Sequence, residues 1–264
     1  WAPEILRSFQ ALVATGRVEI VAETYHHSLA FFYSRFEFEK QVLMHRDAIE
    51  RVFGVRPKVF RNTELAYNNE VGEWAESAGY KAVLAEGWDP ILMGRDPNRV
   101  YSAPTENGIK LLLKNYRLSD DIAFRFSDKN WSQWPLKTER FVNWLPNDEG
   151  SVTNLFMDYE TFGEHQWAST GIFDFLKGFV EYIAGSDQHG FKTVSEASEL
   201  ESVGVADMPQ TVTWADTERD LSAWLANRMQ QEAMRYLYDL EDHIDRKSTR
   251  LNSSHTDISR MPSS

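Results

Sequence analysis

Apolar and polar positions in the N-terminal part of the chain follow two periods in turn. Apolar residues recur every three or four positions over residues 3–14, 38–53 and 69–78, which is the spacing of a helix with one apolar side. Short apolar runs at residues 18–23, 58–61 and 81–85 are typical of strands. This alternation predicts a parallel sheet with helices packed on its faces.

The rest of the chain continues in a similar way. Residues 88–108 are rich in Pro, Asn, Asp and Gly and predict a long loop, residues 109–116 a strand, and residues 119–126 a short capped helix. The apolar run at residues 151–157 predicts a buried strand, residues 172–183 a helix, and residues 191–194 another strand. Residues 218–244 carry one apolar row, which predicts a single long helix capped by Asp216 or Thr217.

Polar side chains follow the predicted strands, where an open parallel sheet binds its ligands. They are His26, His27, Glu64, Glu86, Trp88, Asp158 and Glu160. Because side chains alternate along a strand, Asp158 and Glu160 are expected to face one way and Tyr159 the other. A purely structural reading stays open at this point, since an acid at a strand end can cap the next helix or pair with an arginine, as Glu64 could with Arg61.

Composition narrows the classes of ligand. A chain of 264 residues with 42% hydrophobic residues suits one α/β domain of barrel size or two small ones. The net charge of −12 argues against nucleic acid and anionic membrane surfaces, because both require clustered Lys and Arg. The absence of cysteine excludes disulfides, thiolate metal sites and cysteine nucleophiles. A neutral ligand fits the charge better. Nine tryptophans and ten tyrosines supply rings that can stack on sugars when exposed at a site, although core packing is the more common role of any single ring.

Two carboxyl groups at separate strand ends suggest glycosidic chemistry. Cleaving a glycosidic bond requires one acid to protonate the leaving oxygen and a second carboxylate on the other side of the sugar ring. Glu64 and Asp158 each follow a different predicted strand, so a closed or strongly twisted sheet can bring them to one mouth. A chain with 40 acidic residues contains many such pairs, and spacing alone does not select this one.

Four segments, in this order, resemble successive sequence regions of glycoside hydrolase family 57, in its α-amylase-like branch. They are residues 16–30, which include Glu19-Ile20-Val21-Ala22-Glu23-Thr24-Tyr25-His26-His27, then Phe60-Arg61-Asn62-Thr63-Glu64-Leu65, then Met157-Asp158-Tyr159-Glu160-Thr161-Phe162-Gly163-Glu164-His165, and finally Trp214-Ala215-Asp216 with residues 219–225. The resemblance covers roughly residues 1–245. It implies a retaining mechanism on α-glucans such as starch, glycogen or maltodextrins.

The resemblance also implies roles for individual residues. Glu64 matches the nucleophile and Asp158 the general acid and base. The substrate-binding candidates are Glu19 and His27, with His165, Trp214 and Asp216 as further contacts, and we add Glu160, Trp88 and Asp121 from their positions beside the predicted strand ends. No metal and no cofactor are implied.

The implied fold is α/β, an incomplete (β/α)7 barrel followed by C-terminal helices. The family's first region, a His-Gln-Pro at the end of the first strand, is absent, and the chain begins with Trp1, so we expect an amino-terminally truncated barrel that is missing its first strand region. The expected organisation is a catalytic barrel at residues 1–205, a helical segment at 206–246 and a disordered or non-native tail at 247–264. The expected location is cytoplasmic, and the oligomeric state is open.

Three alternatives accompany this reading. A 4-α-glucanotransferase or a branching enzyme would use the same covalent intermediate and pass it to a sugar hydroxyl instead of water. A non-catalytic carbohydrate-binding remnant would keep the aromatic cleft without turnover. A metal-dependent polysaccharide deacetylase would require two histidines at helical spacing and an aspartate, and the sequence has no such histidine pair.

Overall fold

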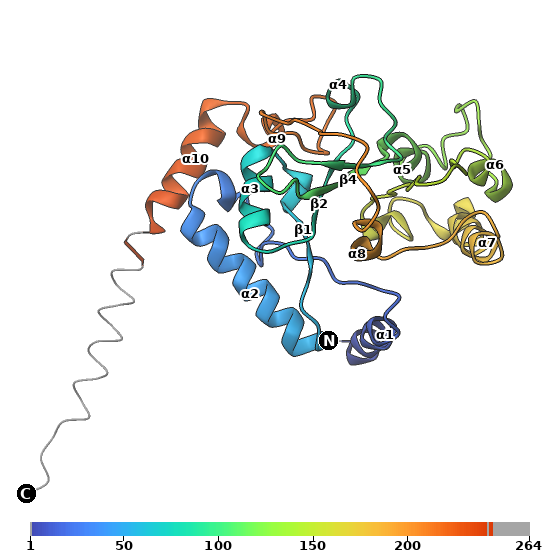
Figure 1. Ribbon diagram of the computed structural model, residues 1–264, viewed down its shortest axis with the longest axis horizontal. Coiled ribbons are helices and arrows are strands. Elements are labelled where there is room, and N and C mark those ends of the chain that lie inside the picture. Colours follow the sequence, from blue (N-terminus) through green and yellow to red (C-terminus); the bar gives the residue numbers. More distant parts are fainter. Residues whose placement is uncertain (1, 242, 245–264) are drawn as a thin grey trace, which may run out of the picture.

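A small mixed sheet forms the centre of the computed structural model, which describes residues 2–241, 243 and 244. Its strands are β1 (Val59–Arg61), β2 (Ala82–Glu86), β3 (Val100–Ser102) and β4 (Lys110–Lys114), in the order β1-β2-β4-β3. Strands β1, β2 and β4 are parallel, and β3 runs antiparallel to β4. Figure 1 shows α2 and α3 on one side of this sheet and α5, α6 and α7 towards the other end of the molecule. The protein is therefore of the α/β class.

Two isolated bridges extend the parallel arrangement on both sides. Ala22 pairs with Phe60 of β1, and Asn154 pairs with Lys114 of β4, both in the parallel sense. Five chain segments thus run in the same direction: the one at Ala22, β1, β2, β4 and the one at Asn154. In the part of the chain that the structure describes, they do not close into a barrel of seven regular strands.

Three predicted strands differ from the structure. The runs at residues 18–23 and 151–157 are reduced to one bridged residue each, because their remaining backbone groups lack a regular neighbouring strand. Residues 191–194 form no strand. They lead instead into α8 (Val194–Ala197), because Thr193 and Glu196 form a capping box at its start.

Most predicted helices are confirmed. They are α1 (Pro3–Ala14), α2 (Arg35–Phe53), α3 (Asn69–Ser77) and α7 (Ile172–Ala184). Their ends follow local signals: Ser34 accepts the Glu37 N–H at the start of α2, and Gly54, with φ of 70°, ends that helix in the left-handed region. Further short elements are η1 (Ala30–Phe32), α6 (Thr138–Val142) and η4 (Ala168–Thr170).

Other predicted helix boundaries were wrong. The predicted loop at residues 88–108 contains α4 (Asp89–Leu92) and β3. Helix α5 (Tyr116–Ala123) starts earlier than predicted, because Asn115 caps it by accepting the Leu118 N–H. The long C-terminal helix is divided into α9 (Ser222–Leu225) and α10 (Arg228–Asp239). Asn227 is extended, and its side chain caps α10 together with Gln230. Asp216 lies in a loop with φ of 47° and caps neither helix.

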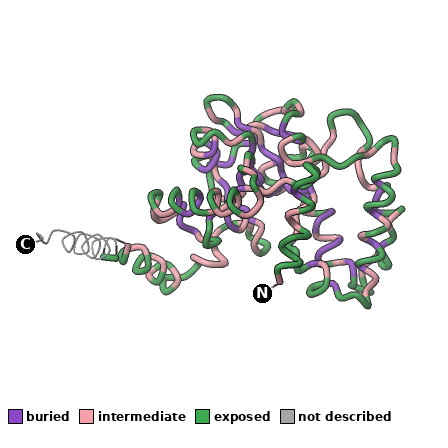
Figure 2. Tube along the Cα trace, turned by 90° about the horizontal axis from the view of Figure 1, so that it is seen from below, coloured by how far each residue is buried: buried purple, intermediate pink, exposed green. Residues whose placement is uncertain are grey.

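The two faces of the sheet contribute to different cores. Val83 and Ala85 of β2 point into the main core, which also contains residues of α2 and α3, whereas Ala82 and Leu84 point to the opposite face. A second core joins α5, α6 and α7 around Phe141. Figure 2 shows buried segments in both regions of the molecule.

The segment between α8 and α9 contributes to the main core. Ala206, Met208 and Val212 are buried there, and Val212 bridges Tyr67. Within the described residues, no helix is both long and apolar enough to cross a membrane. The predicted tail at 247–264 lies outside the described residues.

Candidate active site

The carboxyl ends of the parallel segments converge on one group of polar side chains. His27 follows the segment at Ala22, and Glu64 lies in η2 (Thr63–Leu65), directly after β1. Glu86 and Lys114 are the last residues of β2 and β4, and they are partners in the strand register. The polar side chains that the sequence places after the strands therefore meet at one edge of the sheet, as expected for parallel strands.

Two donors bind the Glu64 carboxylate. His27 Nε2 lies 2.8 Å from Glu64 Oε1, and Trp214 Nε1 donates to Glu64 Oε2 at 2.9 Å. The other nitrogen of His27 contacts the carboxylate of Glu23, and Arg61 binds the second oxygen of Glu23 at 2.9 Å. The result is a chain of alternating charges, Arg61, Glu23, His27 and Glu64, which ends on the Trp214 indole.

These contacts determine the ionisation of the cluster. The hydrogen bond from His27 is the largest effect on Glu64 and, with the Trp214 N–H, holds the pKa of that carboxyl below its ordinary value of 4.5. Hydrogen bonds to Glu23 and Glu64 raise the pKa of His27 to about 9. At neutral pH, Glu64 is therefore a carboxylate beside a protonated imidazole.

Backbone strain is concentrated in the same place. His27, Glu64, Asp216 and Arg219 all have positive φ, between 47° and 55°, although none of them is a glycine. A residue in this region costs on the order of 1–3 kcal/mol and persists only where the surrounding structure fixes it. Such strain clusters at functional sites, and here it occurs on both sides of the Glu64–Trp214 contact.

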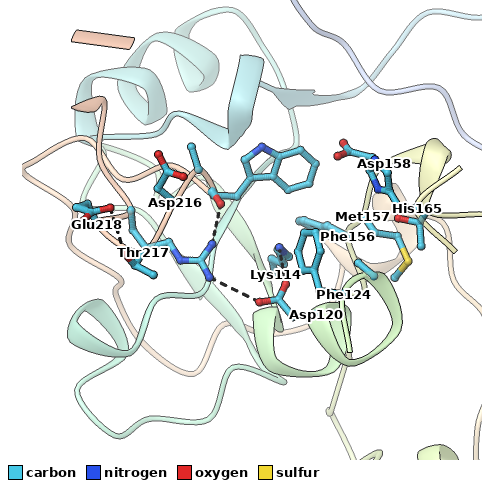
Figure 3. Close-up of a pocket in the computed structure, with 15 residues that line it drawn as sticks. Lys114, Asp120, Phe124, Phe156, Met157, Asp158, His165, Asp216, Thr217 and Glu218 are labelled. Atoms are coloured by element: carbon cyan, nitrogen blue, oxygen red, sulfur yellow. Dashed lines mark hydrogen bonds and ion pairs between the residues drawn. The ribbon is translucent and has the colours of Figure 1, made fainter. Parts of the chain in front are cut away.

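A cavity of about 560 Å³ opens beside the Trp214 ring. One wall comes from α5 and from the loop that carries Asp158 and His165, and the other from residues 214–219. Figure 3 shows Asp158 and His165 on one side, Asp216, Thr217 and Glu218 on the other, and Lys114, Asp120 and Phe124 between them. Its size is within the range of about 300–1,000 Å³ typical of small-ligand sites.

Asp158 is exposed at the edge of this cavity. The chain turns into η3 (Tyr159–Thr161) immediately after it, and the Asp158 side chain makes no capping bond to that turn. The predicted alternation of Asp158 and Glu160 on one strand face was therefore wrong, because the backbone is no longer extended at Glu160. Asp158 lines the cavity and Glu160 does not.

Five predicted substrate contacts are not on the cavity wall: His27, which binds Glu64, and four others. Glu19 accepts the Ser195 N–H at 2.8 Å and contacts the Ser195 hydroxyl, so it holds the start of α8. Trp88 packs against the main core, and Glu160 is exposed in η3. Asp121 pairs with Arg125 at 2.6 Å, and burial raises the pKa of its carboxyl.

The structure brings further charged residues to the site, and the contacts between them were not predicted from the sequence. Glu23 lies four residues before His27 in the same segment, a spacing that could have indicated the contact. Lys114 and Arg219 lie between the acids Glu86 and Asp120 below Trp214, at N–O distances of 3.1–3.9 Å. Only the fold joins these four residues, since they come from distant parts of the chain.

The described residues contain no group of three or more His, Asp or Glu side chains arranged to hold a metal ion. Asp158 is one of the carboxyl residues on the cavity wall, and Glu64 is hydrogen-bonded to the Trp214 indole, which forms another part of the wall. The arrangement places an ionised carboxylate that is held by two donors, and a second, solvent-exposed carboxyl group, around one cavity and its aromatic wall.

An α/β domain with a polar, aromatic-walled cavity at the carboxyl ends of parallel strands belongs to the class of ligand-binding and catalytic α/β proteins. The sequence profile of glycosyl hydrolase family 57 matches residues 1–209, and the chain belongs to this family. The chain is also 47% identical, over 251 residues, to a Methanocaldococcus jannaschii protein named "Putative alpha-amylase". That match covers 94% of this chain and 53% of the relative, so the chain spans about half of the relative's length.

Solved structures share the fold at low sequence identity. A 4-alpha-glucanotransferase from Thermococcus litoralis superposes with a TM-score of 0.67 at 18% identity, over 94% of this chain and 38% of that one. A branching enzyme from Pyrococcus horikoshii gives a TM-score of 0.68 at 18% identity, over 90% of this chain and 55% of that one. At this identity, the likeness establishes the fold alone.

Proposed function

We propose that this chain carries the catalytic centre of a retaining glycoside hydrolase that acts on α-glucans such as starch, glycogen and maltodextrins. The observation that supports this most is the position of Trp214. Its N–H binds the Glu64 carboxylate, and its ring lines the cavity that Asp158 also lines. A double displacement uses two carboxyl groups in different roles, and these two differ in surroundings: Glu64 is bound by two donors and Asp158 is exposed.

In the proposed first step, a glycosidic bond lies between the two carboxyl groups. The Glu64 carboxylate attacks the anomeric carbon, and protonated Asp158 gives its proton to the leaving glycosidic oxygen. The bond from carbon to the leaving oxygen breaks as the bond from carbon to Glu64 forms. The donors on Glu64, His27 and Trp214, keep the nucleophile ionised before the attack.

In the proposed second step, the Asp158 carboxylate removes a proton from water, and the water oxygen attacks the anomeric carbon and releases Glu64. The product keeps the configuration of the substrate because the carbon is inverted twice. His165 and Asp216 line the cavity and are proposed to bind sugar hydroxyls, while the exposed Phe124 ring offers an apolar face for stacking.

The five parallel segments support a partial (β/α)7 barrel as the frame of this site.

Glucan transfer is the second candidate function. The two solved structures reported above are named as a glucanotransferase and a branching enzyme, and a sugar hydroxyl can replace water in the second step. Products longer than the supplied maltooligosaccharide would identify transfer, and reducing sugar alone would identify hydrolysis.

The proposal is tested with Glu64→Gln and Asp158→Asn, assayed for reducing sugar and for chain-length changes in maltooligosaccharides. We expect Glu64→Gln to lose turnover to background while keeping its fold and its sugar binding. Asp158→Asn should lose about 10²- to 10⁴-fold, the usual contribution of a general acid and base. Azide should restore turnover of an activated aryl glycoside by this variant, because azide needs no general base.

Glu164→Gln is the matched control, since Glu164 is exposed in the same loop and does not line the cavity. It should keep wild-type activity. A Glu64→Gln protein that turns over α-glucan at the wild-type rate would sink the assignment. A wild-type chain that binds maltooligosaccharide without any turnover would favour the carbohydrate-binding remnant.

A further inference from the structure

A ring of hydrogen bonds closes the loop that carries Trp214. The Thr213 N–H donates to the Arg219 carbonyl oxygen at 2.9 Å, and the Thr213 hydroxyl donates to the Asp220 carbonyl oxygen at 2.8 Å. From inside the loop, Arg219 Nη1 donates to the Trp214 carbonyl oxygen at 2.8 Å. Residues on both sides of the indole are thus fixed by contacts within residues 213–220.

The same guanidinium joins this loop to the sheet. Arg219 Nη1 lies 3.1 Å from Glu86 Oε2, and Glu86 is fully buried at the end of β2. The other oxygen of Glu86 accepts the Gly87 N–H at 2.8 Å. A buried carboxylate that lost its partner would be costly, so Glu86 is a strong anchor for Arg219.

Two further charged groups face Arg219. Asp120 Oδ2, on α5, lies 3.8 Å from Arg219 Nη2, and Lys114 Nζ lies 3.9 Å from Glu86. The Lys114 ammonium also lies 5.1 Å from the centre of the Trp214 ring. The two bases and two acids balance, and the arginine is the member that also reaches the Trp214 backbone.

Trp214 in turn binds Glu64 at two points. The Trp214 backbone N–H donates to the Glu64 carbonyl oxygen at 3.2 Å, and the indole N–H donates to the Glu64 carboxylate at 2.9 Å. The two points fix both the strained backbone and the side chain of Glu64. A continuous set of contacts therefore runs from Glu86 through Arg219 and Trp214 to the nucleophile.

We propose that Arg219, anchored on Glu86, is a positioning residue that holds the Trp214 indole N–H on the Glu64 carboxylate. The catalytic meaning of this contact rests on the proposed function of Glu64. The contact itself involves no substrate, so it can be measured without turnover. Arginine suits the task because Nη1 reaches both Glu86 and the Trp214 carbonyl while Nη2 faces Asp120, whereas a lysine ammonium at the same position is shorter and has no second nitrogen.

The experiment labels the nine tryptophans with ¹⁵N and follows their indole N–H signals as the pH is lowered. Trp214→Phe identifies the Trp214 signal by its loss. In the wild type, this proton should resonate downfield and shift when Glu64 becomes protonated, which gives the midpoint for that carboxyl. His27, Glu23 and Arg61 also act on this midpoint and are unchanged in all variants that are compared.

In Arg219→Met, the Trp214 indole signal should move upfield, and the Glu64 midpoint should rise by roughly half a pH unit or more, as expected on weakening one hydrogen bond to a carboxylate. Arg219→Lys keeps the charge beside Glu86 and should show the same change, which separates positioning from charge balance. Arg219→Lys also tests the positioning role if Arg219→Met does not fold. In active protein, the acid limb of the kcat/KM profile should move by the same amount.

Arg95→Met is the matched control. Arg95 also donates from Nη1 to a distant backbone carbonyl, that of Val205 at 2.7 Å, but it does not line the Trp214 cavity. It should leave the Trp214 signal and the Glu64 midpoint unchanged. If both Arg219 variants keep the wild-type signal and midpoint, the positioning role is overturned, whatever happens to stability.

The two proposals fail in distinguishable ways. If the wild-type protein neither cleaves nor transfers α-glucans, the proposed function fails, and the indole titration still decides the role of Arg219. If Glu64→Gln is inactive as expected and the Arg219 variants leave the indole signal in place, only the positioning role is lost.

Discussion

His27 decides the charge state around Glu64 at the scale of single residues. Its ring lies between the carboxylates of Glu23 and Glu64, and the two contacts raise its pKa to about 9. A protonated imidazole also explains why two carboxylates can lie so near each other, because it separates like charges that would otherwise raise each other's pKa.

The raised pKa of His27 predicts a loss of stability at alkaline pH. Its contribution is complete below the ordinary pKa of 6.5 and is lost as the pH rises through about 9. Glu64 affects stability at acidic pH. Because its pKa is lowered, its contribution to stability is present above pH 4.5 and is lost as the pH falls through the lowered value. The His27 side chain is 51% exposed, so screening by water limits the effect to about 1 kcal/mol, or about 2–4 °C in unfolding temperature.

The measurement is the unfolding temperature of the wild type and of His27→Gln at pH 6.5 and pH 9.5. The unfolding temperature of the wild type should fall by about 2–4 °C between pH 6.5 and pH 9.5, and that of His27→Gln should fall less. His26→Gln is the control, because the neighbouring His26 is exposed and lies outside the carboxylate pair. An equal drop in His27→Gln and wild type would contradict the assignment.

The residues at the cavity were easier to predict from the sequence than the residues that hold them in place. Glu64, Asp158, Trp214 and His165 come from motifs that are each local, and the structure brings them to the cavity or to its wall. The sequence placed Glu86 at a strand end, but its contact with Arg219 was out of reach, because the two residues are 133 positions apart. No periodicity or local motif records such a pairing.

At the scale of elements, the end of β2 allows little room beside β4. A Cβ atom on Gly87 would lie 2.2 Å from the Lys114 carbonyl oxygen, which is backbone and cannot rotate away. Gly87 also supplies the N–H that binds Glu86. The glycine therefore allows the two strand ends, and with them the ion cluster below Trp214, to lie in contact.

Gly87→Ala should destabilise the protein by about 1–3 kcal/mol, the usual cost of overfilling a packed site. The measurement is the urea midpoint, combined with the Trp214 indole signal, which should shift as the end of β2 moves. Gly190→Ala is the control, since a Cβ at that position would meet nothing within 4 Å. Equal midpoints for the two variants would show that β2 adjusts freely at this point.

The same scale shows why helices were predicted more accurately than strands. The bounds of α1, α2, α3 and α7 follow from apolar spacing and from caps such as Ser34, all within one segment. The segments at Ala22 and Asn154 pair through one residue each, and pairing depends on a neighbour far away in the sequence. The division between α9 and α10 was readable in principle, because Asn227 and Gln230 form a capping box inside the apolar row.

At the scale of the whole molecule, the two proposed catalytic carboxyl groups belong to different cores. Glu64 follows β1, whose Phe60 is buried in the main core with α2 and α3. Asp158 is flanked by Met157 and Phe162, which pack against the second core of α5, α6 and α7. Figure 1 shows these two groups of helices at different ends of the molecule, with the sheet between them. The distance between the carboxyl groups therefore depends on how firmly the second core holds its loop.

This arrangement predicts that the two cores loosen separately. Phe141 and Phe38 are both fully buried, the first in the second core and the second in the main core. Replacing either with alanine should cost about 3–5 kcal/mol. Phe141→Ala should increase hydrogen exchange in residues 116–184, lower kcat, and leave the Trp214 indole signal unchanged, because Trp214 and Leu65, the neighbour of Glu64, pack on the opposite face of the sheet and not in the second core.

Phe38→Ala is the matched opposite. It should increase exchange in α2, α3 and β1 and disturb the indole signal. The two variants should differ because local opening follows the contacts that each core makes. A helix that is released from the second core leaves the hydrogen bonds between β1, β2 and β4 intact. Exchange that rises to the same degree in both regions for both variants would mean that the cores unfold as one unit. In that case, Asp158 would be held by the whole fold, and only changes at the cavity itself would alter its position relative to Glu64.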